Sequence, residues 1–139
     1  MATGTAEKVD SILPRTEGGR LAELRQRMEH AEQALVNYDA AGASLIKATS
    51  NLAYAEAERA TQKMAAIGRL VEQVNPATGK PFTVSQADDF AQLDPAYAMY
   101  KARCLGLQLR KMEAEHALES ARLTAIYAEA LVRRAGGMS

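Results

Sequence analysis

Glu113 and His116 are the two side chains whose spacing comes nearest to that of a metal site. Residues three apart share one face of a helix, and di-iron carboxylate bundles use a glutamate and a histidine at this spacing on each of two helices. A complete site needs a second pair, which a second copy of the chain could supply, and two further glutamates. The only other histidine, His30, has Arg27 three residues before it. We therefore predict no metal and no cofactor, and place His116 on a helix face at a packing seam.

Two other motifs also argue against catalysis. Thr78, Gly79 and Lys80 resemble the end of a phosphate-binding loop, but the leading glycine and the preceding strand of such a loop are missing. Cys104 is the only cysteine and fits a small apolar position on a helix face. With one cysteine and two histidines, all most easily placed on packing faces, nucleophilic catalysis lacks its parts. The sequence predicts a protein that is not an enzyme.

Basic side chains gather in two places. The first group has the acids Glu17 and Glu23 among its members, which are Arg15, Arg20, Arg25 and Arg27. The second group has no acid among its members, which are Lys101, Arg103, Arg110 and Lys111. Because no acid interrupts it, the second group is the better candidate for contacting the phosphates of a nucleic acid. The alternative is an ordinary solvated helix face.

The composition fits one domain in the cytoplasm. A length of 139 residues is typical of a single domain. Seventeen basic and seventeen acidic residues cancel, so no overall field attracts the chain to nucleic acid or to a membrane. Aromatic residues make up 5% and tryptophan is absent, which suits alanine-lined helices better than a large core. A single cysteine, the absence of a long apolar run and the absence of a signal pattern indicate a cytoplasmic protein that does not enter a membrane.

The longest pattern in the chain predicts one helix over residues 19–74. Steps of three and four residues from Leu21 trace the a and d positions of a coiled coil: Leu21, Leu24, Met28, Ala31, Leu35, Tyr38, Gly42, Leu45, Thr49 and Leu52. Beyond Leu52 this register would bring Glu56, Arg59 and Lys63 into the seam. We therefore expect the buried line to move one residue on, through Ala53, Ala57, Ala60, Met64, Ile67, Val71 and Val74.

A break near Gly42 is the alternative to an unbroken first helix. Residues 37–44 include Asn, Asp, Gly and Ser, which favour turns, and a glycine costs about 1 kcal/mol against alanine inside a helix. A break would turn the hairpin into a three-helix bundle. The continuous seam favours the unbroken helix, because patterning outweighs an isolated glycine.

The rest of the chain divides at its prolines. Residues 1–18 predict a flexible N-terminal arm, and residues 19–139 a single helical domain. Asn75 and Pro76 end the first helix and open a loop over 75–94. In that loop Phe82 and Val84 form an apolar plug, and the spacing Ser85-Gln86-Ala87-Asp88 predicts the cap of a short helix that runs to Leu93. Asp94 and Pro95 then start a second long helix, predicted over 95–135.

The second long helix carries two apolar faces. One face is Ala98, Ala102, Leu105, Leu109, Met112, His116 and Leu123. The other is Tyr100, Cys104, Leu107, Ala114, Leu118, Ala121, Ala125, Ala128 and Val132. A single partner helix can cover one of these stripes but not both.

Self-association follows from the unequal lengths of the two predicted helices. Helix 19–74 is longer than helix 95–135, so part of its seam has no partner within the chain. The unpaired part exposes Leu21, Leu24, Met28 and Leu35, a stripe too apolar to leave in water. We predict a homo-oligomer, a dimer or higher.

The second half of the chain resembles small uncharacterised helical proteins of temperate phages and prophages. The resemblance covers roughly residues 50–130. It lies in the loop Asn75-Pro76-x-Thr78-Gly79-Lys80-Pro81, in Asp94-Pro95-x-Tyr97, and in Leu118-Glu119-Ser120-Ala121-Arg122-Leu123. It implies an accessory role on DNA or on a DNA-handling enzyme, and it implies no active-site residues.

Together these patterns predict an all-α, coiled-coil-like protein, a long antiparallel helical hairpin with a structured loop. The expected function is a non-enzymatic helical interaction protein with an unknown protein partner, accessory to phage recombination or replication. One alternative is direct DNA binding through Lys101, Arg103, Arg110 and Lys111. Another is a component of virion assembly or a scaffold.

Overall fold

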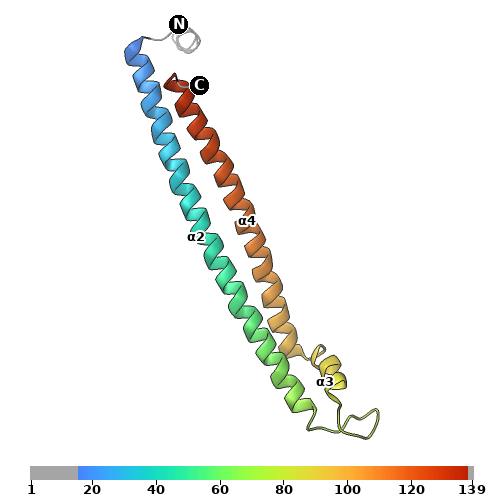
Figure 1. Ribbon diagram of the computed structural model, residues 1–139. Coiled ribbons are helices and arrows are strands. Elements are labelled where there is room, and N and C mark those ends of the chain that lie inside the picture. The colour runs from blue at the N-terminus through green and yellow to red at the C-terminus, as the bar shows by residue number, and fades with distance from the viewer. Residues whose placement is uncertain (1–15, 138–139) are drawn as a thin grey trace, which may run out of the picture. The chain divides into compact units, whose positions relative to one another are not determined.

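The computed structural model describes residues 16–137 and confirms the all-α prediction. Within these residues the chain forms three helices, α2 (Glu17–Leu70), α3 (Val84–Ala91) and α4 (Pro95–Ala135), and no strand (Figure 1). The predicted arm over residues 1–18 lies almost entirely outside the described residues. The chain divides into two compact units, and each takes a segment of α2 and a segment of α4. The first unit is Met1–Ala41 with Ala117–Ser139, and the second unit is Gly42–His116.

α2 begins at Glu17, two residues before the predicted start. Its first turn is capped by Thr16, whose side-chain oxygen accepts a hydrogen bond from the backbone N–H of Gly19 at 3.1 Å. Glu17 also places an acid where the helix dipole favours one. The helix then continues without interruption through residues 37–44. The alternative of a break near Gly42 is therefore wrong, because the flanking alanines offset the cost of one glycine.

α2 ends at Leu70, four residues before the predicted end. Pro81 forms an isolated antiparallel bridge with Val74, and the N–H of Phe82 donates to the carbonyl of Gln73 at 3.1 Å. The N–H of Asn75 donates to the carbonyl of Lys80 at 2.7 Å. These loop bonds use the backbone groups that another helical turn would need, so the helix stops where the loop pairing begins.

The loop after α2 is closed by Asn75, a buried polar side chain. Its Oδ1 accepts from the N–H of Ala77 at 3.0 Å, and its carbonyl accepts from Gly79 at 2.8 Å. Gly79 has a φ of 69°, a left-handed conformation that glycine adopts at little cost. The predicted apolar plug is half right, because Phe82 is buried here but Val84 is exposed.

α3 is capped by Thr83, not by Ser85 as the sequence predicted. The Thr83 side chain accepts from the N–H of Gln86 at 3.2 Å, and the Gln86 side chain accepts from the N–H of Thr83 at 3.1 Å. This is the reciprocal capping box, two residues earlier than expected. Ala87 and Ala91 on the buried face of α3 pack with Phe82 and with Ile67 of α2.

An ion pair also fastens α3 to α2. Lys63 Nζ lies 2.8 Å from Asp88 Oδ1, and this hydrogen bond raises the pKa of Lys63. Because folding raises the pKa of Lys63, its ion pair with Asp88 stabilises the docked α3 fully at pH values below the ordinary pKa of lysine. The contribution is lost as the pH rises through the folded value.

We expect Thr83→Ala to destabilise the protein by about 1 kcal/mol, because the first turn of α3 loses its cap. Urea unfolding followed by circular dichroism measures this change. Ser85→Ala is the matched control, since Ser85 is exposed and its substitution should change the unfolding free energy by less than about 0.5 kcal/mol. Equal effects of the two substitutions would contradict the assignment of the cap.

α4 spans Pro95–Ala135, the predicted bounds. The carboxylate of Asp94 accepts from the N–H of Ala96 at 3.0 Å, and Pro95 occupies the first helical position, where its missing N–H costs nothing. At the other end Gly137 has a φ of 77°, and the N–H of Gly136 donates to the carbonyl of Val132 at 2.9 Å. A left-handed glycine just past the last turn is a common way to end a helix.

In each unit a segment of α2 packs against an antiparallel segment of α4 (Figure 1). In the first unit Ala34 of α2 packs with Ala125 and Ala128 of α4, with Ala31 beside them. All three central residues are buried. Alanines at these positions let the two backbones approach closely, which suits a chain with few aromatic residues.

The observed seam of α2 shares only part of the predicted one. The shared positions include Leu24, Ala31, Tyr38, Leu45 and Leu52, which are all buried or half-buried. At three positions between them the buried residue comes one place earlier than predicted. Ala34 and Ala48 are more buried than their predicted neighbours Leu35 and Thr49, and Arg27 replaces Met28. At Ala34 and Ala48 the seam thus selects a small side chain and leaves the larger neighbour outside.

The predicted shift of the seam beyond Leu52 is seen only near the end of α2, where Ile67 is buried and Val71 is half-buried. Ala53, Ala57, Ala60 and Met64 are exposed. The heptad continues instead through Ala55, Arg59, Gln62 and Ala66, which are buried or half-buried. Arg59 occupies such a position with its aliphatic stem packed, and its Nε is buried without a hydrogen-bond partner among the residues that the structure describes.

On α4 the structure covers only one of the two predicted faces. The covered face holds Tyr97, Tyr100, Cys104, Leu107, Ala114, Leu118, Ala121, Ala125, Ala128 and Val132, all buried or half-buried. The other face is exposed throughout and holds Ala98, Ala102, Leu105, Leu109, Met112, His116 and Leu123. The stripe left over on α4 is therefore the one with the larger side chains.

Candidate functional site

The four basic residues proposed to contact phosphates do not share one face of α4. Arg103 and Arg110 are seven residues apart, lie on one side and line the same groove. Lys101 points elsewhere, because its Nζ donates to Gln92 Oε1 at 3.2 Å and lies 5.7 Å from the centre of the Tyr97 ring. Lys111 is half-buried at the seam between α2 and α4. The structure thus brings two of the four together.

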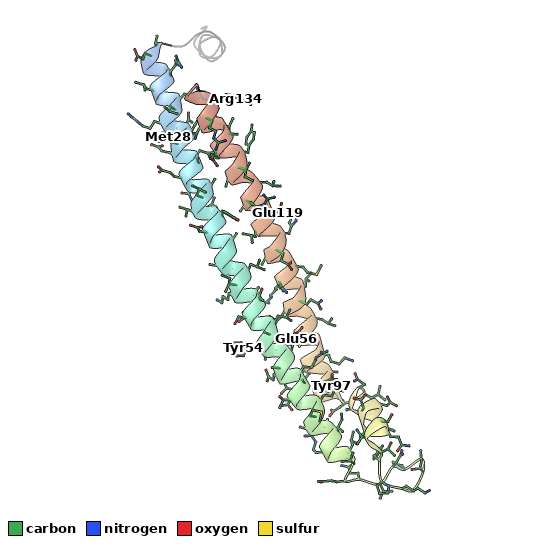
Figure 2. The ribbon with its side chains drawn as sticks, in the orientation of Figure 1. Met28, Tyr54, Glu56, Tyr97, Glu119 and Arg134 are labelled. Carbon is green, nitrogen blue, oxygen red and sulfur yellow. The ribbon has the colours of Figure 1, made fainter. Side chains whose placement is uncertain are left out.

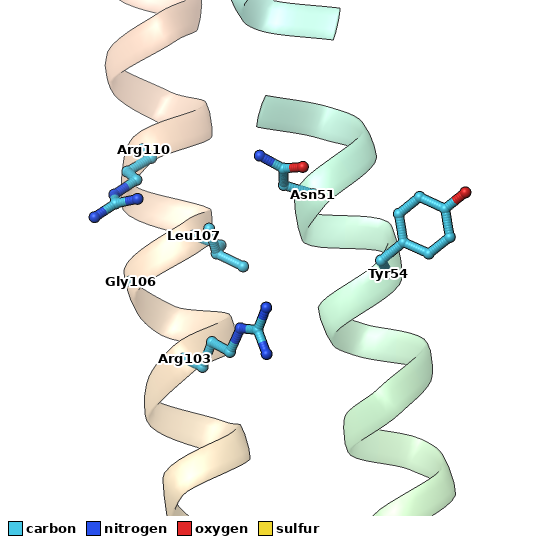
Figure 3. A pocket seen from close by; sticks show the side chains of 6 residues that line it. All are labelled: Asn51, Tyr54, Arg103, Gly106, Leu107 and Arg110. Atoms are coloured by element: carbon cyan, nitrogen blue, oxygen red, sulfur yellow. The ribbon is translucent and has the colours of Figure 1, made fainter. Parts of the chain in front are cut away.

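The groove beside these two arginines is open and has a volume of about 500 Å³. Its lining comes from α2 (Asn51, Tyr54) and from α4 (Arg103, Gly106, Leu107, Arg110) (Figure 3). Figure 3 shows the Asn51 amide turned toward α4 and the Tyr54 ring turned outward. At Gly106 an added Cβ would meet no atom within 4 Å, so the floor of the groove is free on that side.

The charges of the groove are only partly compensated. Arg103 Nη1 lies 3.4 Å from Glu58 Oε2, and both side chains are exposed, so this pair contributes little to stability. Arg110 makes no ion pair or hydrogen bond with the residues that the structure describes. The groove therefore offers one free guanidinium and a second one in a weak pair. Either can bind an anion, because a guanidinium presents a planar set of N–H donors.

The second unit also carries an exposed apolar stripe on α4. We define the outer stripe as Ala98, Ala102, Leu105, Leu109, Met112 and His116. Its three large side chains are all exposed, with Leu105 at 67%, Leu109 at 58% and Met112 at 60%. The spacing alternates between four and three residues, so the six side chains form one continuous line along the helix. Such a line is typical of a surface that packs against another helix.

The residues predicted for self-association lie in the first unit. Leu21, Met28 and Leu35 are exposed, whereas Leu24 is half-buried. The three exposed residues repeat every seven positions along α2, and Figure 2 marks Met28 on that helix. They form a second apolar line next to the seam, so Leu24 belongs to the contact with α4 and the other three remain available.

Glu113 and His116 lie on the exposed side of α4. Among residues 16–137 no three His, Cys, Asp or Glu side chains come close enough to hold a metal ion together. Cys104 is buried at the seam. His116 lies on a helix face, as predicted, and that face is the exposed outer stripe, not the contact between α2 and α4.

We expect the purified protein to carry less than about a tenth of an equivalent of iron, manganese or zinc, because a single Glu-x-x-His pair supplies too few ligands. Elemental analysis of protein prepared without chelators measures this content. A stoichiometric metal that is lost on His116→Ala but retained in His30→Ala would overturn the prediction.

Sequence patterns alone did not identify four residues of the groove. Asn51, Tyr54, Gly106 and Leu107 are separated along the chain, and only the antiparallel packing of α2 on α4 brings them to one place.

Comparison of the chain with protein-family models, with curated proteins and with solved structures found no match in any of the three. None of the helices in residues 16–137 is long and apolar enough to cross a membrane.

Proposed function

We propose that the protein is a non-enzymatic helical interaction protein that binds other helices, including those of a second copy of itself. The observation that carries this proposal is that several large apolar side chains lie outside the contact between α2 and α4. In the first unit alanines line the contact between α2 and α4, and in both units large apolar side chains of these helices are exposed. Exposed apolar side chains are common one at a time. Continuous lines of them at heptad spacing are typical of helix-packing surfaces.

Two such lines support the proposal independently. The outer stripe lies on α4 in the second unit, and the line Leu21, Met28 and Leu35 lies on α2 in the first unit. Both lines use positions that the intrachain seam does not. Covering them would remove large apolar side chains from water, each worth about 1.5–3 kcal/mol when fully buried.

Light scattering of the full chain at micromolar concentration tests the proposal. We expect a mass of at least twice the 15.0 kDa of one chain. Leu21→Glu combined with Met28→Glu should lower the association if the α2 line contributes, because two charges then enter an apolar contact. A monomer for the unmodified chain at all concentrations up to the millimolar range would contradict the proposal.

The resemblance to temperate phage and prophage proteins supports an accessory role in recombination or replication as the setting of this activity. A role in virion assembly or as a scaffold uses the same surfaces. Purification of tagged protein from native cells, with and without nuclease, separates the two. A partner that is lost after nuclease treatment favours the recombination or replication setting, and structural proteins of a particle favour assembly.

The groove favours a second candidate function, contact with single-stranded nucleic acid. Arg103 and Arg110 can neutralise phosphates, and the side chain of Tyr54 is 76% exposed and can stack on a base. Gly106 leaves room for a backbone to pass between the two arginines. This candidate replaces the predicted four-residue stripe with a site built from both helices.

We expect a labelled single-stranded oligonucleotide to bind weakly at low salt, with an affinity that falls steeply as salt rises because counterions are released. Arg110→Glu should reduce this affinity about tenfold or more, and Tyr54→Ala should reduce it by the loss of one stacked base, about 1–3 kcal/mol. Fluorescence anisotropy measures both effects. Lys80→Glu makes the same charge change on an exposed loop residue, and equal losses in the two charge variants would contradict the groove as the site.

A further inference from the structure

We propose that the outer stripe of α4 binds the outer stripe of a second copy, with the two α4 helices antiparallel about a two-fold axis near residue 107. This inference rests on the proposed self-association and names its surface and its geometry. All six residues of the stripe lie in the second unit. The proposal therefore uses one compact unit and one helix of it.

The sizes of the side chains favour the antiparallel arrangement. With the axis near residue 107, Leu105 of one copy faces Leu109 of the other, and Ala102 faces Met112. The ends of the stripe meet in the same way, with Ala98 opposite His116. Each small side chain therefore meets a large one, the condition for close packing along a helix pair. A parallel pair would place Ala98 on Ala98 and Ala102 on Ala102, which leaves gaps beside the larger residues.

The charges along the edge of the stripe select the same arrangement. Lys101 and Glu115 lie on the same edge, each one position before a residue of the stripe. In the antiparallel pair Lys101 of each copy lies close to Glu115 of the other, so the contact gains two opposite-charge pairs. In a parallel pair Lys101 would lie beside Gly106, and Glu115 beside Ser120, so neither charge would be compensated. Edge charges of this kind determine the orientation and partner choice of helix pairs.

Both charged groups are free enough to make these contacts. Glu115 is exposed and makes no ion pair or hydrogen bond with the residues that the structure describes. Lys101 donates one hydrogen bond to Gln92, and an ammonium group has three donors, so two remain. A shift of the two helices by one heptad would separate Lys101 from Glu115, so the charges also determine the register.

The first experiment identifies the surface. Leu109→Asp introduces a charge at the centre of the stripe, and we expect the dissociation constant of the dimer, measured by light scattering on dilution, to rise at least tenfold. Because Leu109 is exposed within the chain, the helical circular dichroism signal should stay unchanged. Ile46→Asp is the control, an exposed apolar residue of the same unit that lies on α2. An association unchanged by Leu109→Asp would overturn the proposed surface without contradicting self-association itself.

The second experiment tests the orientation by exchanging charges. Lys101→Glu and Glu115→Lys should each weaken the dimer about tenfold, because each replaces two attractive pairs with two repulsive ones. The double variant Lys101→Glu/Glu115→Lys restores the opposite charges and should return the dissociation constant to within about threefold of its original value. If the losses of binding free energy in the two single variants simply add in the double variant, the antiparallel register is overturned.

The third experiment measures the geometry directly. In a Cys104→Ala background, a spin label introduced at Ala98→Cys should lie about 27 Å from its copy, since 18 residues of helix separate the two positions along the axis at 1.5 Å each. In a mixed dimer, labels at Ala98→Cys and His116→Cys should lie about 10 Å apart, the ordinary spacing of packed helices. A distance near 10 Å between two labels at residue 98 would show a parallel dimer and overturn the proposal.

Discussion

Phe82→Ala should cost about 3 kcal/mol of unfolding free energy, the largest effect that we expect from a single truncation in the described chain. Phe82 is buried against Ala66, Ile67, Ala87 and Ala91. Its ring meets that of Phe90 edge-on, with the ring centres 5.0 Å apart. Removing a buried phenylalanine side chain takes away this apolar contact and leaves a cavity, which together cost about 3–5 kcal/mol in well-packed sites.

The neighbouring valine provides the control for this prediction. Val84 lies two residues away in the same predicted plug but is exposed, so Val84→Ala should change the unfolding free energy by less than about 0.5 kcal/mol. Urea titrations of both variants measure the difference. Hydrogen exchange should also quicken in residues 83–92 of the Phe82 variant, because α3 loses its main apolar anchor. Similar costs for the two substitutions would contradict the packing described here.

The helices were predictable from the sequence because their signals are local. Proline at residue 95, an acid before it and a glycine pair at the far end define α4 without reference to any other element. The end of α2 was not predictable in this way. It depends on Pro81 and Phe82 returning to pair with Val74 and Gln73. The same contacts place Thr83 where it can cap α3, so the true cap was confused with a similar spacing two residues later.

The faces of the helices were harder to predict than the helices themselves. A heptad pattern places a/d positions on one side, but Ala34 and Leu35 are adjacent, and either can complete the pattern. Steps of three and four residues from Leu21 lead to Leu35 and pass over Ala34. The structure uses the smaller one here, because a close approach of two helices leaves no room for leucine.

The candidate sites show the same limit. Arg103 and Arg110 were predicted as part of a basic group because no acid interrupts that group. Their partners in the groove come from α2, about fifty residues earlier in the chain. A pattern along one helix can therefore suggest a site, but packing decides which of its residues are brought together. Lys101 is turned away because Gln92, at the end of the loop, gives it a local acceptor.

The choice between adjacent residues on α2 leads to the second large prediction, Ala34→Leu. Ala34 is 4% exposed and packs with Ala125 and Ala128, whereas Leu35 is 56% exposed. A leucine at residue 34 has to displace one helix from the other or adopt a strained side-chain conformation. Overpacking of this kind costs about 1–3 kcal/mol. Alanine and leucine are both strong helix formers, so the change in helix propensity is small and does not obscure the packing cost.

Leu35→Ala is the matched substitution. The seam predicted from the sequence and the seam seen in the structure give opposite expectations for Ala34→Leu and Leu35→Ala. With the seam that the sequence predicted, Leu35→Ala would create a cavity and cost about 2–5 kcal/mol, while Ala34→Leu would be nearly neutral. With the seam that the structure has, Ala34→Leu is the damaging change and Leu35→Ala costs less than about 0.5 kcal/mol. Thermal and urea unfolding should be compared at a chain concentration low enough that association through Leu35 does not contribute. A larger loss from Leu35→Ala than from Ala34→Leu under those conditions would mean that α2 presents its leucines to α4 after all.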